Sequence, residues 1–186
     1  MNRAPVRCFV LPFACALVLP LLHAQAGAAR GKPMNFKIST SSFLVEGTIP
    51  KKFTCDAQDI SPELSWSGAS ENTRSFALIA DDPDAPAGTW THWIAWNIPA
   101  SAHELKEGVA KELQFSDGMR QGQNDFRKIG YNGPCPPPGK PHRYYFKLFA
   151  LDANLDLKSG STRKELESAM KSHLLAQTDV LGRYGR

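Results

Sequence analysis

The chain has 186 residues and carries 22 Lys and Arg against 18 Asp and Glu, a formal net charge of +4 at pH 7. This length fits one domain with a sizeable core. The basic residues form no stripe along the sequence, which argues against a nucleic-acid-binding protein.

Residues 1–26 have the layout of a secretory signal peptide. A basic start is followed by an apolar run from Cys8 to Leu22 and by the small-x-small cleavage sequence Ala24-Gln25-Ala26. The apolar run is short for a bilayer span, and a retained membrane anchor is the alternative interpretation. Cleavage leaves residues 27–186 as a single domain with no transmembrane segment, which we expect to be periplasmic or secreted. The loss of two arginines lowers the net charge from +4 to +2.

Hydrophobic patterning predicts a mainly β fold with peripheral helical additions. Runs of apolar and alternating residues separated by Gly, Pro and Asp predict strands at 36–38, 43–45, 64–66, 75–82, 89–98 and 143–151. The run at 89–98 is apolar on both faces, which favours a central position in the sheet.

The later part of the chain adds one predicted helix. Thr162 to Glu165 reads as a capping box, and Leu166, Met170, His173 and Leu174 then fall on one helical stripe. The tail at 179–186 is expected to form a short final element. Residues 115–129 read as a long loop, and loops of that length in a compact domain often carry function.

The stretch ADDPDAPAGTWTHWIAWN, from Ala80 to Asn97, is the centre of the candidate site. Its first strand ends at a carboxylate, Asp82, and a proline-rich turn follows. A period of two places Trp90 and His92 on the same face of the next strand, and the same alternation continues to Ile94 and Trp96. Carboxylates, an imidazole and an indole are therefore candidates for one small concave site at the end of a sheet.

A second notable stretch, GYNGPCPPPGKPH, runs from Gly130 to His142. Its glycines allow the backbone to approach a ligand and to point N–H groups inward. His142 and Tyr144 share one face of the strand that follows, and both side chains can donate hydrogen bonds. Such donors suit a phosphate or a carboxylate, while Asp82 would orient a histidine or receive the ammonium group of a ligand.

Simpler interpretations exist for individual residues. Asp84 in a DPDAP turn suits an Asx turn, and His92 beside three tryptophans suits a hydrogen-bonded core histidine. No GxSxG, HExxH, P-loop or GxGxxG motif is present, so we expect no enzyme, no cofactor and no metal. Asp82, Asp84, His92 and His142 keep metal-dependent phosphoester hydrolysis as a lesser alternative, without diagnostic spacing.

Four stretches together resemble the phosphatidylethanolamine-binding protein (PEBP) family, also called the Raf kinase inhibitor-like family, and are most similar to its bacterial YbhB/YbcL branch. The resemblance implies a PEBP-like β-sandwich, in which a large central sheet packs on a smaller sheet with peripheral helices. It also implies a small pocket that accepts anions such as phosphate, acetate or a phosphoryl headgroup. The stretches are FTCDAQDISPELSW (53–66), DDPDAPAGTWTHWIAWNIP (81–99), GYNGPCPPPGKPHRYYFKLFALD (130–152) and VLGRYGR (180–186).

The family motifs carry over to single residues of this chain. Their ligand contacts correspond to Asp82, Trp90, His92, Pro134, His142 and Tyr144. Supporting positions correspond to Asp84, Pro86 and Gly133, with Ala85–Pro86 as a candidate cis bond. Tyr184 near the C-terminus is a weaker correspondence, expected at the rim of the pocket.

Residues 27–186 keep two cysteines, Cys55 and Cys135. In an exported protein this pair can form one disulfide, and its spacing fits no zinc or CxxC motif. Similar cysteines in family members without a signal peptide leave two free thiols as the alternative.

The expected partner is a small anionic ligand or a phospholipid headgroup, bound in a pocket too small for acyl chains. A protein-interaction module, such as a protease inhibitor or a modulator of kinase signalling, is the main alternative. It would use the exposed loop at 115–128, with the pocket as an accessory.

Overall fold

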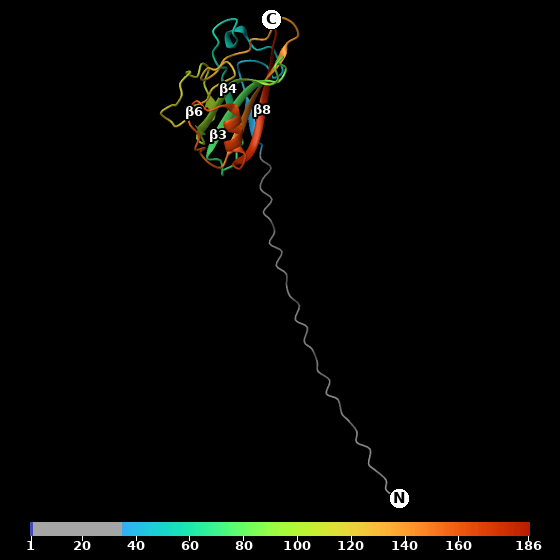
Figure 1. Cartoon of the computed structure of the whole chain (residues 1–186), viewed down its shortest axis with the longest axis vertical. Helices are drawn as coiled ribbons and strands as arrows, with labels where there is room; N and C mark the ends of the chain where they lie inside the picture. Colours follow the sequence, from blue (N-terminus) through green and yellow to red (C-terminus); the bar gives the residue numbers. More distant parts are fainter. Residues whose placement is uncertain (2–34) are drawn as a thin grey trace. The chain divides into compact units, whose positions relative to one another are not determined.

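The computed structural model describes Met1 and residues 35–186, so the signal peptide expected at 1–26 lies outside the described part apart from its first residue. The main feature is an antiparallel five-stranded sheet in the order β6-β4-β3-β7-β8 (Figure 1). Its strands are β3 (Ser75–Asp82), β4 (Trp90–Pro99), β6 (Arg120–Gln121), β7 (His142–Leu151) and β8 (Leu174–Tyr184).

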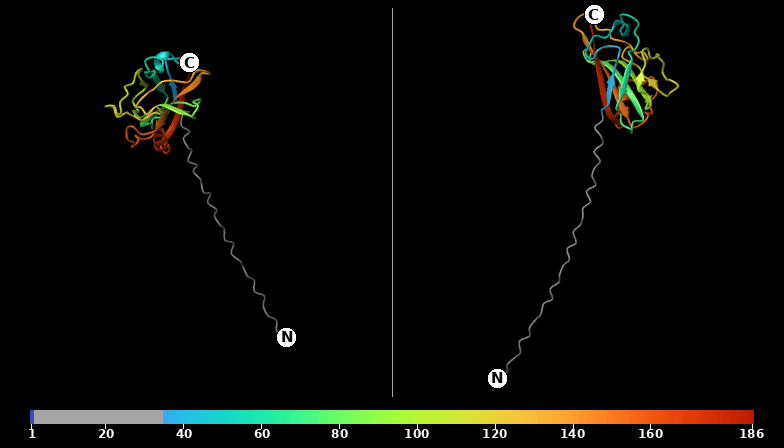
Figure 2. Two further views of the ribbon diagram at one scale, coloured as in Figure 1. Left: turned by 45° about the horizontal axis from the view of Figure 1, so that its top comes forward. Right: turned by 180° about the vertical axis from the view of Figure 1, so that it is seen from behind.

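A smaller sheet covers one face of the large one. It contains β1 (Lys37–Ser39), β2 (Leu64–Ser67) and β5 (Glu104–Leu105), in the order β1-β2-β5. Helix α1 (Arg163–Met170) lies across the opposite face, and a short 3-10 turn, η1 (Lys51–Phe53), precedes β2 (Figures 1 and 2). The expected sandwich of a large sheet, a smaller sheet and a peripheral helix is confirmed.

The side chains of β3 show why the large sheet is covered on both faces. All eight residues of this strand are buried. Phe76 and Leu78 belong to the core beneath the small sheet, whereas Ala77 and Ile79 pack with Leu166 and Met170 of α1. A strand with two apolar faces must lie between two covering layers. The sequence predicted such a central position for the next strand, β4, and β4 does lie inside the sheet, between β6 and β3.

β4 contains an irregularity that the sequence pattern conceals. Ala80 of β3 pairs with Trp93, but Asp81 pairs with Thr91, so His92 has no partner on β3. One extra residue in one strand is a β-bulge, which changes the face on which later side chains lie. Trp90 and His92 share a face as expected, but Ile94 then lies on the α1 face, so the predicted alternation stops at the bulge.

Three predicted elements differ from the structure. Residues 43–45 form no strand but a turn, in which Leu44 and Val45 are 83% and 69% exposed and Glu46 has φ of 61°. Helix α1 begins at the expected capping box but ends at Met170, so the stripe does not reach Leu174. The tail is not a short element, because β8 pairs along the whole of β7.

The segment 115–129 is more ordered than a free loop. It contains β6, which pairs with β4, and its Met119, Gln121 and Asn124 are buried. No helix within residues 35–186 combines the length and the apolar character needed to cross a bilayer.

Candidate functional site

A cavity of about 250 Å³ opens where β3 ends and where β4 and β7 begin. We call it the cup. Ten of its lining residues are Asp82, Pro86, Ala87, Trp90, His92, Phe126, Cys135, Pro136, His142 and Tyr144. Five of the six residues expected to contact a ligand are therefore brought together, from segments up to 60 positions apart.

Asp82 and His142 form the polar floor of the cup. Asp82 Oδ2 lies 2.8 Å from His142 Nδ1, and the two side chains are 5% and 13% exposed. Asp82 Oδ1 accepts a hydrogen bond from the backbone N–H of Asp84 at 2.8 Å. Both carboxylate oxygens are thus satisfied within the protein, and Nε2 of His142 is left for the cup. Asp82 orients a histidine, as expected.

His92 is held in one tautomer by a carbonyl oxygen. Its Nδ1 lies 2.7 Å from the backbone oxygen of Asn132, which can only accept, so Nδ1 carries the proton. Burial lowers the pKa of His92, although the Asn132 carbonyl and the charge of Asp82 oppose this effect. The neutral ring then presents Nε2 as an acceptor. His92 is both a hydrogen-bonded core histidine and a residue of the cup wall, so the two interpretations of it are compatible.

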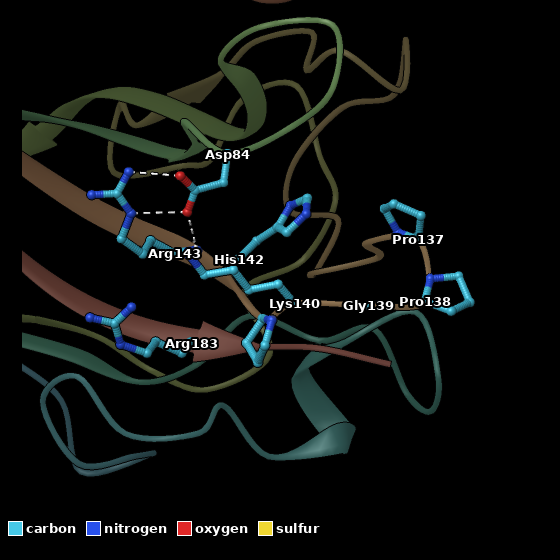
Figure 3. Close-up of a pocket in the computed structure, with 9 residues that line it drawn as sticks. Asp84, Pro137, Pro138, Gly139, Lys140, His142, Arg143 and Arg183 are labelled. Atoms are coloured by element: carbon cyan, nitrogen blue, oxygen red, sulfur yellow. Dashed lines mark hydrogen bonds and ion pairs between the residues drawn. The ribbon is translucent and has the colours of Figure 1, made fainter.

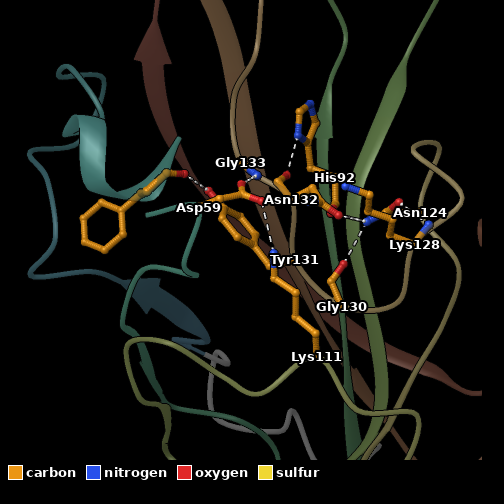
Figure 4. A network of polar contacts seen from close by, with 10 residues as sticks. Asp59, His92, Lys111, Asn124, Lys128, Gly130, Tyr131, Asn132 and Gly133 are labelled. Carbon is orange, nitrogen blue, oxygen red and sulfur yellow. Dashed lines mark hydrogen bonds and ion pairs between the residues drawn. The ribbon is translucent and has the colours of Figure 1, made fainter. Parts of the chain in front are cut away.

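A buried network fixes the carbonyl that holds His92 (Figure 4). Asn132 Nδ2 donates to Asp59 Oδ2 at 2.8 Å, and Asn124 Nδ2 donates to Asn132 Oδ1 at 2.9 Å. The bulge leaves the His92 carbonyl without a partner on β3, and the N–H of Asn132 donates to it at 3.0 Å. Sequence reasoning did not single out Asp59, which lies in the stretch DAQDISP (56–62) and has a positive φ of 55° in the structure.

Two buried polar groups on residues that line the cup have no hydrogen-bond partner within 3.5 Å among the described residues. They are the hydroxyl of Tyr144, whose side chain is 3% exposed, and the indole Nε1 of Trp90. Burial, and then the negative charge of Asp82, raise the pKa of Tyr144 far above its ordinary value, so its hydroxyl stays protonated. Each group is a donor with an unused hydrogen bond, and buried donors are rarely left unpaired.

Two of the supporting residues, Asp84 and Pro86, belong to the turn after β3. Asp84 does not line the cup. Its carboxylate binds the Arg143 guanidinium at 2.7 and 2.9 Å, and these bonds lower the pKa of Asp84 to about 2. The Asx interaction of this turn comes from Asp82 instead. Pro86 lines the cup, but the Ala85–Pro86 bond is trans, so the cis candidate is wrong.

Pro134 and Gly133 belong to the outer side of the cup wall. Pro134 is buried and does not line the cup, and its carbonyl accepts the N–H of Cys55 at 3.1 Å. A Cβ on Gly133 would lie 2.0 Å from the Phe53 carbonyl oxygen, so this glycine permits close contact with backbone rather than with a ligand. Its N–H donates to Asp59.

The wall formed by residues 135–137 is tied to the rest of the fold at two points. Cys135 forms a disulfide with Cys55. Arg186 Nε donates to the Pro136 carbonyl at 2.7 Å. Tyr184 does not line the cup, and its hydroxyl donates to Asp56 instead. Within residues 35–186, no three His, Cys, Asp or Glu side chains gather in a group that could hold a metal ion.

Comparisons with known proteins agree with this fold. Residues 39–185 match the family model described as phosphatidylethanolamine-binding protein. A UPF0098 protein of Pyrococcus horikoshii is 45% identical over 98% of this chain and 92% of its own length. A UPF0098 protein of Methanothermobacter thermautotrophicus is 46% identical over 82% of this chain and 99% of its own.

Two solved structures share the fold. Escherichia coli YbcL, described as a new member of the mammalian PEBP family, has a TM-score of 0.76 and 31% identity, covering 81% of this chain and 98% of its own. A putative PEBP homologue of Chlamydia trachomatis has a TM-score of 0.74 and 36% identity, covering 81% and 97%.

Proposed function

This chain belongs to the phosphatidylethanolamine-binding protein family, and on that premise we propose that its cup binds a small anion, such as phosphate or a phospholipid headgroup. The role is one of binding rather than catalysis. The observation that carries the proposal is the pair of unpaired donors, Tyr144 O–H and Trp90 Nε1–H, beside a histidine whose Nε2 is free. A ligand with acceptor oxygens satisfies both of these donors.

The charges of the cup limit the kind of anion. Asp82 contributes a carboxylate, and His142 can supply a positive charge in its imidazolium form. His92 Nε2 needs a donor from the ligand, because its ring is held neutral with the proton on Nδ1. A protonated phosphate, or a headgroup that carries an O–H or N–H, provides such a donor together with acceptor oxygens.

The size of the cup limits the ligand further. At about 250 Å³, it is smaller than the roughly 300–1,000 Å³ typical of sites for drug-sized ligands. It suits a headgroup, so the acyl chains of a bound lipid would remain outside.

Titration calorimetry with inorganic phosphate tests the proposal. His142→Ala or His92→Ala is expected to weaken binding by about 1–3 kcal/mol, the cost of losing one partner of a buried hydrogen bond. The matched control is His173→Ala, because His173 forms a similar pair with Asp152 at 2.8 Å but lies outside the cup. Unchanged phosphate affinity in both cup variants would exclude this role. Mass spectrometry of small molecules released from the protein, purified from its own compartment, would identify the natural ligand.

The two alternatives predict different results. A protein-interaction module using residues 115–128 would lose its partner on alanine substitution in that loop and keep it on substitution of Asp82. Phe126 lines the cup, so part of this loop is common to both functions. A hydrolase would turn over a phosphoester and lose that activity on addition of a chelator.

We also propose that the protein is exported after cleavage near Ala26. The signal-like start of the sequence and the disulfide between Cys55 and Cys135 support this location, because disulfides persist in oxidising compartments. N-terminal sequencing of the mature protein and cell fractionation test it. A cytoplasmic protein that still begins at Met1 would contradict it.

A further inference from the structure

A second cavity, of about 510 Å³, lies beside the cup (Figure 3). We call it the groove. It shares His142 and Pro137 with the cup, so the two cavities are contiguous. Three basic side chains line the groove, Lys140, Arg143 and Arg183, together with one acidic side chain, Asp84.

The two arginines are opposite each other in the sheet. Arg143 of β7 pairs with Arg183 of β8, and Figure 3 shows both guanidinium groups extending in the same direction. Like charges directly opposite on neighbouring strands destabilise a sheet. The Asp84 carboxylate neutralises Arg143 by accepting two hydrogen bonds from the Arg143 guanidinium. Among the residues that the structure describes, Arg183 has only Glu46 as an ion-pair partner, at 3.8 Å, and the Glu46 side chain is 67% exposed.

The groove therefore keeps an excess of positive charge. Lys140 forms no ion pair with any described residue. Three cations against one carboxylate leave a formal charge of +2 before His142 is counted. The Asp84 bonds use Nε and Nη2 of Arg143 and fix the plane of its guanidinium, so its remaining N–H groups are pre-oriented donors.

We propose that the groove is a second anionic subsite, which binds a phosphate or carboxylate on the same ligand whose first anionic group occupies the cup. The ligand class is thus a small molecule or lipid headgroup with two or more anionic groups. The inference depends on the proposed function for the first group. An anion in the groove would also relieve the repulsion between Arg143 and Arg183.

Calorimetric titrations with inorganic phosphate and with tripolyphosphate test the inference. On this inference phosphate occupies the cup, whereas tripolyphosphate occupies the cup and extends into the groove. The double variant Lys140→Gln/Arg183→Gln is expected to bind tripolyphosphate at least about tenfold more weakly, because two charge-assisted contacts are lost, and to bind phosphate as before. The control Lys106→Gln/Lys171→Gln removes the same charge from exposed residues outside both cavities and should leave both affinities unchanged.

The outcomes separate the two proposals. If wild-type protein binds phosphate but the groove variant keeps full tripolyphosphate affinity, or the control variant loses as much, the groove inference is wrong. If phosphate fails to bind at all, the proposed function is wrong. Phosphatidylcholine vesicles that contain phosphatidic acid distinguish a lipid ligand from a soluble one. Vesicle binding that is lost in the groove variant indicates a lipid headgroup. Tripolyphosphate binding without vesicle binding indicates a soluble ligand. Either result supports the subsite.

Discussion

Replacing Tyr144 by phenylalanine should separate ligand binding from fold stability. The Tyr144 hydroxyl is buried and has no partner within 3.5 Å among the described residues, and the nearby Asp82 carboxylate offers it only a longer contact, so its burial is poorly compensated in the free protein. In the proposed complex the same hydroxyl donates to the anion. Tyr144→Phe removes one oxygen and leaves the ring packed in the core, so it should act on the two states in opposite directions.

The magnitudes follow from these contacts. A buried polar group without a partner costs about 1–3 kcal/mol, so its removal should leave the free energy of unfolding unchanged or raise it. A hydrogen bond to a charged group contributes about 1.5–3 kcal/mol, so phosphate affinity should fall about 10- to 150-fold.

Tyr131→Phe is the matched control. The Tyr131 hydroxyl is also buried, but it donates to the Phe53 carbonyl at 2.7 Å and lies outside the cup. Its loss should lower the free energy of unfolding by about 1–3 kcal/mol and leave phosphate affinity nearly unchanged. Urea denaturation measures stability, and calorimetry measures affinity. A Tyr144→Phe protein that is clearly destabilised but binds phosphate like the wild type would refute the reasoning.

Three further predictions concern the cup and its support. Burial lowers the pKa of His92 below its ordinary value of 6.5, so the imidazole is protonated in the unfolded chain at a higher pH than in the folded protein. The free energy of unfolding should therefore be unaffected by His92 above pH 6.5 and should decline below it, by at most about 1.4 kcal/mol per pH unit. A urea series should show a shallower decline in His92→Gln, and identical slopes would contradict this. Below its second pKa of about 6, methyl phosphate keeps a P–OH that can donate to His92 Nε2, whereas sulfate has no such donor. Near that pH methyl phosphate should therefore bind more tightly than sulfate, and competition titration should show the difference in affinity shrinking as pH rises. Equal affinities throughout would argue against His92 Nε2 as an acceptor. Gly133→Ala would place a Cβ 2.0 Å from the Phe53 carbonyl oxygen, so we expect the free energy of unfolding, measured with urea, to fall by about 1–3 kcal/mol. An unaltered denaturation curve would mean that the backbone at Phe53 moves aside without cost.

The parts of the fold that the sequence predicted well are those with a strong local pattern. The strand at 75–82 was predicted with its bounds, because eight buried residues lie between clear turn signals. The start of α1 was predicted from its capping box. Only the end of β8 was predicted, as a short element at 179–186, because β8 is an edge strand of mixed polarity and only its last residues alternate clearly.

The candidate site shows the same limit. Residues expected around a ligand, such as Asp82 and Tyr144, do meet at one cavity, since each follows from a strand end or a strand face. The extra residue at His92 cannot be recognised in the sequence of a strand that is apolar on both faces. The predicted shared face was therefore correct for Trp90 and His92 but not for Ile94. The role of Asp59 depends on a contact 73 positions away, with Asn132, which no local pattern encodes.

The unpaired position in β4 matters for anyone who wishes to transplant this cavity into another scaffold. From Trp93 to Trp96, odd and even positions lie on exchanged faces relative to Trp90 and His92, until a second register shift returns Ile98 to the first face, so copying the side chains onto a regular hairpin would bury some of them on the wrong layer. A successful graft must import the extra residue together with the Asn124 and Asn132 groups that satisfy its carbonyl. The transferable unit is thus a backbone defect with its polar supports, rather than a set of side chains.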